Sequence, residues 1–227
     1  MAPSPSTSLT PVLLPGQPSP EIAPGRPAPP LAVDPLPDFL PGRLRLRTAN
    51  TADYHVLAPF HYRTGRPATW ARILAVTYAP DRAGRREEPR VVAVGVLSWP
   101  TAVSRPRRIA FGLEGAGYAA QIAFANRHVR TISRIIVHPQ FRGMGLARLL
   151  IGRLCTACPT RFVKATASMA DAHPMFERAG MRRLPREDGG PAYFWLDRAP
   201  DRAFPRLPHA LGGARQRRRA RTAAGEV

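Results

Sequence analysis

The fold is decided by "VHPQFRGMGLARLL", residues 137–150, in which two glycines separate a β-rich run from an amphipathic one. The preceding "TISRIIV" (131–137) predicts a strand, and leucines on one helical face predict a helix that begins after Gly145: Leu146, Leu149, Leu150 and Leu154. Backbone N–H groups at a helix start are unpaired, and together with the helix dipole they attract anions. Gly143 and Gly145 permit positive φ and close approach of a phosphate. The turn is therefore either an anion site or a packing turn without a ligand.

Two side chains beside the turn carry donors that could reach such an anion. Gln140 and Arg142 precede Gly143, and an arginine guanidinium matches phosphate oxygens. The spacing is not that of a Walker P-loop, because no Gly-Lys-Ser/Thr follows. It also departs from the dinucleotide-binding fingerprint, since Arg148 stands where that pattern has its third glycine.

The rest of the chain predicts an α+β (mixed α/β) fold in one domain. Strands are predicted at 43–48, 72–79, 90–99, 161–168 and 192–197, and helices at 51–63, with Thr51 as N-cap, and at 173–180. The strands at 72–79 and 90–99 form a predicted hairpin, and residues 100–130 predict a long loop with a short helix. An early antiparallel hairpin and a late strand–helix–strand unit therefore share one chain.

The ends of the chain differ in composition from its middle. Thirteen of the 27 prolines lie in residues 1–41, so residues 1–42 predict a Pro-rich, disordered leader. Residues 43–198 are the predicted domain, and residues 199–227 a basic, disordered tail. No stretch approaches the roughly 20 apolar residues of a membrane span, and no secretory signal is recognisable. These features predict a cytoplasmic protein without a membrane partner.

Charge and cysteines leave several alternatives open. The net charge of +19 is either an arginine-rich composition bias or a field that attracts a phosphorylated cofactor, a nucleic acid or an acidic substrate. Lys164 is the only lysine. Cys155 and Cys158 lie near the end of the predicted helix, where its dipole raises a thiol pKa, and two cysteines make only half a zinc site. Free thiols and no metal are predicted.

The turn resembles a known motif. "IIVHPQFRGMGLARLL" resembles the acetyl-CoA-binding motif of the GNAT family of N-acetyltransferases, through Val137, Pro139, Gln140, Gly143 and Gly145. "AHPMFERAGMRRL" (172–184) resembles the next signature of that family. The resemblance covers about residues 43–198 and implies a three-layer fold, in which helices flank a central, mixed but mostly antiparallel sheet.

The resemblance also implies a site and an activity. A strand is expected to pair with the pantetheine arm, and the turn to hold the coenzyme A pyrophosphate; the implied contacts are Ile135, Ile136, Val137, Gln140, Arg142, Gly143, Met144, Gly145, Leu146, Ala147 and Phe176. The implied reaction is direct attack of an amine acceptor on acetyl-CoA, which is a co-substrate.

One position departs from the family pattern. Family members commonly donate a proton from a tyrosine of the second signature, and this chain has Phe176 there. The alternative acids are His173, Ser168, Tyr62 and His61, or solvent; otherwise the module binds acetyl-CoA without turnover. The central strand offers only Ser133 and Arg134 in place of a carboxylate base. His61 and Tyr62 either line the acceptor groove or serve the end of the first helix.

Two further interpretations concern partners. "FHYRTGRPAT", "SRIIVHP" and "MFERAGM" together resemble the acetyltransferase-like module appended to certain ABC-type ATPases, so an ABC-type ATPase is one expected partner. The tail segment "RQRRRAR" (215–221) favours association with a nucleic acid or a ribosomal component. The remaining alternative is a non-catalytic coenzyme A-binding or interaction module.

Overall fold

The computed structural model describes most of the predicted domain and little of either end. The described residues are 31–32, 42–62, 65–82, 85–86, 88–185 and 190–205. Most of the predicted leader and all of the tail from residue 206 onward lie outside them, so these two predictions stay predictions.

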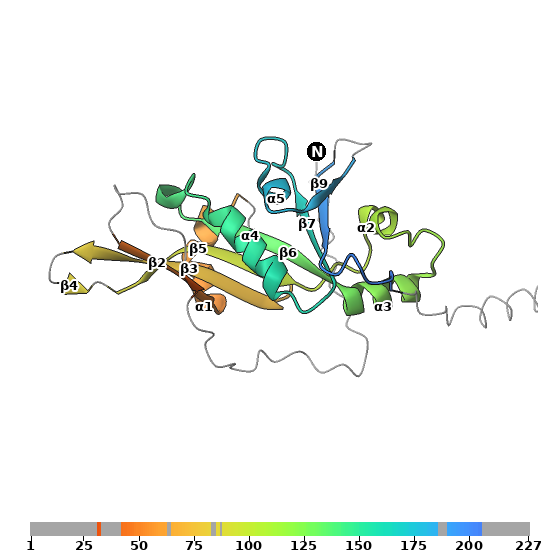
Figure 1. The fold of residues 1–227 in the computed structure, drawn as a ribbon, viewed down its shortest axis with the longest axis horizontal. Coiled ribbons are helices and arrows are strands. Elements are labelled where there is room, and N and C mark those ends of the chain that lie inside the picture. The colour runs from red at the N-terminus through yellow and green to blue at the C-terminus, as the bar shows by residue number, and fades with distance from the viewer. Residues whose placement is uncertain are drawn as a thin grey trace, which may run out of the picture.

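One sheet runs through the described chain (Figure 1). Its strands follow the order β1-β2-β3-β5-β6-β7-β9-β8, with β4 paired to β3. Their bounds are β1 Leu31–Ala32, β2 Gly42–Thr48, β3 Arg72–Arg82, β4 Arg85–Arg86, β5 Arg90–Ser98, β6 Val129–Val137, β7 Phe162–Ala167, β8 Arg182–Leu184 and β9 Ala192–Asp197. Only β6 and β7 pair in parallel; all other neighbours are antiparallel. The predicted hairpin is confirmed as β3 and β5.

Helices cover both faces of this sheet. Their bounds are α1 Thr51–Leu57, α2 Arg105–Ala110, α3 Tyr118–His128, α4 Leu146–Ala157 and α5 Met175–Arg178, with 3₁₀ turns η1 Ala58–Phe60 and η2 Pro139–Phe141. Adjacent strand residues point to opposite faces. Val163 packs in the cluster that includes α4, whereas Phe162 packs in the cluster that includes α3. The predicted α+β fold, with helices flanking a mostly antiparallel sheet, is confirmed.

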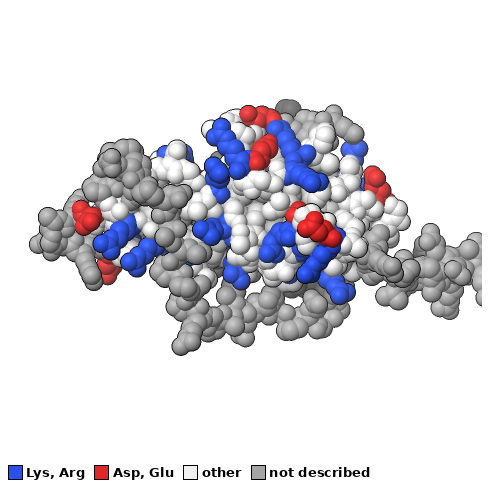
Figure 2. Space-filling model, viewed as in Figure 1, with Lys and Arg blue, Asp and Glu red and all other residues white. Residues whose placement is uncertain are grey.

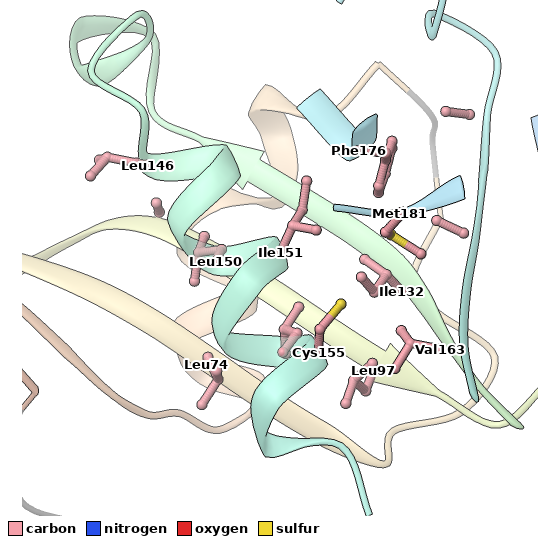
Figure 3. Packing of buried hydrophobic residues seen from close by; sticks show 14 of the residues in the cluster. Leu74, Leu97, Ile132, Leu146, Leu150, Ile151, Cys155, Val163, Phe176 and Met181 are labelled. Carbon is pink, nitrogen blue, oxygen red and sulfur yellow. The ribbon is translucent and has the colours of Figure 1, made fainter. Parts of the chain in front are cut away.

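The α4 face holds the larger core. Leu150, Ile151 and Leu154 are fully buried, and they pack against side chains of β3, β5, β6 and β7. Figure 3 shows Leu150 and Cys155 of α4 facing the sheet residues Leu74 and Leu97. Burying a side chain of this size stabilises a fold by about 1.5–3 kcal/mol. This apolar face fixes α4, and with it the turn that precedes the helix.

The N-cap of the first helix lies one residue earlier than predicted. Asn50, not Thr51, is the N-cap: its side chain accepts from Asp53 N at 3.1 Å, and Asp53 Oδ2 accepts from Asn50 N at 3.0 Å. Arg47 donates two further bonds to Asp53, at 2.8 and 2.6 Å. Burial opposes ionisation of Asp53, but the bonds from Arg47 and Asn50 lower its pKa. The helix ends at Leu57 rather than at 63, because Pro59 continues it only as a 3₁₀ turn.

The region from 100 to 130 is more ordered than its sequence suggests. It forms α2 and α3, where one short helix was expected. Arg107 is fully buried at α2 and donates to the carbonyls of Thr101 and Ala102, both at 2.6 Å. Aromatic packing fixes α3, since the Phe124 ring lies 6.1 Å from that of Phe162 in β7. Weak apolar periodicity hid both helices, and β8 is a strand that the sequence did not predict.

The last described residues pack against the domain. The Phe204 ring stacks on Phe124 with centroids 5.9 Å apart, and Arg161 donates to Ala203 O at 2.6 Å. Arg161 also holds Asp197 at 2.8 and 2.7 Å, which lowers the pKa of that carboxyl. Packed structure therefore extends at least to Phe204, beyond residue 198.

Basic side chains do not gather into one patch on the visible face of the molecule. Figure 2 shows them spread over that face rather than over one element. Cys155 and Cys158 are free, as predicted, and both are buried; burial raises the pKa of Cys155 to about 11, with Cys158 adding to the effect. Among the described residues, no helix is both long and apolar enough to span a membrane.

Candidate functional site

The parallel pair of strands separates partway along its length. Val129–Ile132 of β6 pair with Phe162–Ala165 of β7, and there the pairing stops. β6 continues to Val137 alongside β5, while β7 continues to Ala167 alongside β9. In the described part of the chain, no strand pairs with the β7 side of residues 133–137. That strand edge is open to a ligand that could supply the missing backbone partners.

A β-bulge in β6 lies where the strands separate. Val96 pairs with Arg134 and Leu97 with Ile132, so Ser133 is the extra residue. Its hydroxyl lies 2.7 Å from that of Ser98, which donates to Thr69 O at 2.6 Å. Either hydroxyl can be the donor of the shared bond, and Ser133 Oγ also lies 3.4 Å from Val96 O. The bulge re-aims β6 away from β7.

The glycine turn follows β6 directly. Phe141, buried in η2, anchors the turn with its ring 5.2 Å from that of Tyr78. Gly143 and Gly145 have φ of 82° and 76°, in the left-handed region that glycine adopts without a penalty. A Cβ built at either glycine would meet no atom within 4 Å. The glycines are therefore required by backbone conformation, and the space above them is open.

The N-terminus of α4 presents its backbone donors uncapped. Among the residues that the structure describes, no side chain caps the helix at Gly145. The first intrahelical bond runs from Leu149 N to Gly145 O at 3.0 Å, so the N–H groups of Leu146, Ala147 and Arg148 precede it. These donors and the helix dipole form the kind of site that holds a phosphate.

The two side chains expected to assist the turn, Gln140 and Arg142, differ in their contacts. Arg142 folds back, donating to Val137 O at 3.3 Å and to Phe60 O at 3.4 Å. The Phe60 ring meets His138 edge-on at 4.8 Å. Gln140 is exposed. The end of η1 and the turn are thereby brought together, which the sequence alone did not indicate.

The expected contacts along β6 alternate between the two faces. Ile136 is buried in the cluster with α1, whereas Ile135 and Val137 pack at the edge of the α4 cluster. Leu146 is buried and Met144 half-buried in the α4 cluster. The roles of these side chains toward coenzyme A stay predictions.

Phe176 is a core residue in this structure. Its ring is 4% exposed and stacks on Phe194 of β9, with centroids 5.0 Å apart. A phenyl ring in this position supplies packing and no proton.

The alternative acids come from separate elements. His61 is half-buried and Tyr62 is 59% exposed, with their rings 4.7 Å apart just beyond η1. Ser168 and His173 are exposed in the segment between β7 and α5. Arg134, the other central-strand candidate, donates to Ser133 O at 2.8 Å and to Gly65 O at 3.4 Å.

The sequence missed a buried polar group on the face opposite α4. Arg107, Thr131, Lys164 and Tyr193 lie close to where β6 and β7 separate, and each except Thr131 is less than 5% exposed. The one available signal was Lys164, a lone lysine inside an apolar strand of an arginine-rich chain. Arg107 could not be found from sequence, because its segment had no recognisable element.

A protein-family model matches the part of the chain that contains this site. The acetyltransferase (GNAT) family model matches residues 77–181, a range that contains the glycine turn and most of the second signature. The match supports the GNAT resemblance and acetyl transfer as a general activity. No curated protein matches the chain. An ABC-type ATPase partner stays a prediction.

Three solved structures of low identity align with about two thirds of this chain. Ard1 from Thermoplasma volcanium is 15% identical, with 68% of this chain and 97% of that chain covered and a TM-score of 0.42. NAA60 of Arabidopsis thaliana in complex with acetyl-CoA is 13% identical, with 67% and 96% covered and a TM-score of 0.46. A mutant agmatine N-acetyltransferase in its apo form is 13% identical, with 68% and 99% covered and a TM-score of 0.42.

Proposed function

We propose that this chain is an acyl-CoA-dependent N-acyltransferase, which transfers an acetyl group from acetyl-CoA to an amine acceptor. The observation that carries the proposal is the turn from Arg142 to Gly145, with two left-handed glycines and an uncapped helix behind it. Acetyl-CoA suits this geometry, because its pyrophosphate needs backbone donors and its pantetheine amides need an unpaired strand edge.

The proposed pyrophosphate contacts are backbone groups rather than side chains. The N–H groups of Leu146, Ala147 and Arg148 lack intrahelical partners, and no Cβ covers Gly143 or Gly145. Arg142, which lies over the end of β6, adds a positive charge beside them. The pantetheine arm would then follow residues 133–137, with its amides taking the place of a paired strand.

The proposed chemistry needs no covalent enzyme intermediate. The neutral amine attacks the thioester carbonyl, the new C–N bond forms, and the C–S bond breaks. The amine loses a proton to a base, and the departing thiolate gains one. His61, Tyr62 and His173 stay candidates for these proton transfers. Ser133 is a weaker candidate, because its hydroxyl proton is shared with Ser98.

A second candidate function is coenzyme A binding without turnover. It is favoured by Phe176, which occupies the tyrosine position of the family signature and is buried against Phe194. A buried phenyl ring cannot protonate a thiolate, so turnover depends on another acid or on solvent.

The direct test is amine-dependent release of the coenzyme A thiol, followed with a thiol reagent that reads free coenzyme A. We expect release only when acetyl-CoA and an amine are both present, and we expect Gly145→Glu to abolish it by placing a carboxylate at the pyrophosphate site. Gly152→Ala in the middle of α4 is the matched control, because a Cβ there meets no atom within 4 Å. Binding of acetyl-CoA without thiol release across a panel of amines would favour the non-catalytic alternative.

A further inference from the structure

A group of buried side chains with hydrogen-bond donors lies on the face of the sheet opposite α4. Thr131 of β6 pairs in register with Lys164 of β7, and Tyr193 of β9 pairs with Thr166, two residues further along. Register and alternation place Thr131, Lys164 and Tyr193 on one face. Lys164 Nζ lies 5.6 Å from the centre of the Tyr193 ring. We name Arg107, Thr131, Lys164 and Tyr193 the buried donor cluster.

Arg107 joins this cluster from α2. It lies close enough to Lys164 to lower the pKa of the lysine, whose burial is the larger cause, to about 8. Burial raises the pKa of the Tyr193 hydroxyl, and the positive charge of Arg107 partly opposes that rise. Two basic groups and a phenol, all with buried side chains, therefore influence one another.

The cluster has an excess of positive charge. Arg107 is 0% exposed and donates to two backbone carbonyls, while Lys164 is 4% exposed and faces the Tyr193 ring. Within the described ranges, neither residue forms an ion pair with a carboxylate. Two buried cations without a counter-ion are expensive, because each loses its hydration and repels the other.

The cluster also has an excess of donors. Among the described residues, Arg107 Nε, Thr131 Oγ1 and Tyr193 Oη are buried and have no hydrogen-bond partner. Buried polar groups are almost always paired, so three orphans beside two cations indicate a missing group. Arginine and lysine can only donate, and both hydroxyls have a proton to give. A ligand that accepts several hydrogen bonds and carries negative charge would pair these donors and offset the two cations.

We propose that the buried donor cluster binds a carboxylate. A carboxylate offers two oxygens with about four acceptor positions, which suits the unpaired groups of Arg107, Thr131 and Tyr193 and the charge of Lys164. Its charge offsets the two cations in a way that a water molecule cannot. One source of this group is the carboxylate of an amine acceptor, and the other is a small free carboxylate held by the fold.

The position of the cluster favours the acceptor as the source, and this part rests on the proposed function. Lys164 and Thr131 form the last but one pair before β6 and β7 separate. They face away from α4, whose N-terminal turn is the proposed coenzyme A site. An acceptor that reached the separated strands from the face of α1 and α2 would meet the cluster with its anionic end.

The experiment uses the single lysine of the chain. Protein labelled with ¹³C at lysine Cε gives one resonance, that of Lys164, whose pH titration is recorded without acetyl-CoA in a buffer free of small anions. Sodium acetate is then added as the probe. An anion favours the protonated amine, so we expect the midpoint of the Lys164 titration to rise by at least half a pH unit at millimolar acetate.

Variants separate a specific site from a general salt effect. Thr131→Val keeps the shape of the side chain and removes one donor, and Tyr193→Phe removes another. We expect each to weaken the acetate response at least threefold. Arg105→Gln, which removes a positive charge at the exposed start of α2, is the control for a general charge effect, and it should leave the response unchanged. 4-Aminobutyrate, which carries an amine far from its carboxylate, tests the source. A response to both probes indicates the acceptor, and a response to acetate alone indicates a resident carboxylate.

An unchanged Lys164 titration in folded wild-type protein at 50 mM acetate would overturn the proposal. So would an equal response in the wild type, Thr131→Val and Tyr193→Phe, since that indicates ionic strength alone. Neither result depends on coenzyme A. Failure of the carboxylate site is therefore distinguishable from failure of the acyltransferase proposal, which acetyl-CoA binding and the Gly145→Glu variant test separately.

Discussion

The two faces of the central sheet are built on different principles. On the α4 face, aliphatic and aromatic side chains form a continuous core that holds α4 and α5 against the strands. On the opposite face, two smaller apolar clusters are present, one beneath α1 and the other beside α3. The buried donor cluster lies on this second face, as does Ser98 with its bond to Ser133.

The two faces of the sheet therefore have different roles: one holds α4 in place, and the other carries buried polar side chains. The apolar face fixes a helix start, where the proposed ligand contacts are backbone groups that tolerate little displacement. The second face keeps buried polar groups that reduce stability, which is typical of functional sites. The proposed coenzyme therefore meets the rigid face, and the proposed acceptor meets the polar one.

The largest expected effect is on the apolar face. Leu150→Ala removes a fully buried side chain from the α4 core and should lower the free energy of unfolding by about 2–5 kcal/mol. Urea denaturation followed by circular dichroism measures this difference. Val103→Ala, at a side chain that is 58% exposed, should change it by less than about 0.5 kcal/mol. Similar losses in both variants would contradict a rigid α4 face.

The second prediction concerns the polar face and pH. The pKa of Lys164 is lowered from 10.5 to about 8, so above pH 8 the folded state releases a proton that the unfolded state keeps. The free energy of unfolding therefore rises with pH between about 8 and 10.5, because the unfolded state binds one more proton than the folded state in that range. Without a bound anion, Lys164→Met should be more stable than the wild type at pH 7 by up to about 3 kcal/mol, at about 1.4 kcal/mol per pH unit.

Urea denaturation of both proteins at pH 7, 8 and 9.5 measures how far the difference between the free energies of unfolding of Lys164→Met and the wild type decreases with pH. The Tyr193 hydroxyl titrates in both proteins, so its contribution cancels in the difference between their free energies of unfolding. Lys164→Arg keeps the positive charge throughout and serves as the control. A difference in free energy of unfolding that stays constant with pH would show that Lys164 is not a buried cation.

Two glycines of the same helix offer a third comparison. Gly145 has φ of 76° at the cap, so Gly145→Ala should destabilise by about 1–2 kcal/mol. Gly152 lies within α4, and Gly152→Ala should stabilise by about 1 kcal/mol. Thermal unfolding should shift in opposite directions in the two variants. A shift in the same direction would mean that the turn has another conformation in solution.

The smallest expected effect tests the start of α1. Asn50→Ala removes the capping side chain and should cost about 1 kcal/mol. Thr51→Ala, at the residue predicted from sequence as the cap, should cost less than about 0.5 kcal/mol. Chemical denaturation of the pair decides between the two caps, and a larger loss for Thr51→Ala would restore the sequence prediction.

The sequence predicted well wherever local signals agreed. The strand before the turn, Gly143 and Gly145 in the left-handed region, and the apolar stripe of α4 are all encoded within about 20 residues. Hydrophobic periodicity and glycine chemistry are local, so one short stretch suffices to predict them.

What the sequence missed depends on contacts distant along the chain. The cluster assembles Arg107 from α2, Lys164 from β7 and Tyr193 from β9, and no local pattern indicates that they meet. The separation of β6 from β7 depends on a bulge at Ser133 and on the competing pairing of β7 with β9. Asn50 was missed as a cap because Thr51 beside it is also a favoured capping residue.

The central claim is that backbone donors at the start of α4 hold the pyrophosphate of coenzyme A. Calorimetric titration of the purified protein with acetyl-CoA, in parallel with Gly145→Glu and Gly152→Ala, tests it most directly. The account predicts micromolar binding by the wild type and by Gly152→Ala, and a loss of at least 100-fold in Gly145→Glu. Absence of binding by folded wild-type protein, or equal binding by Gly145→Glu, would contradict it.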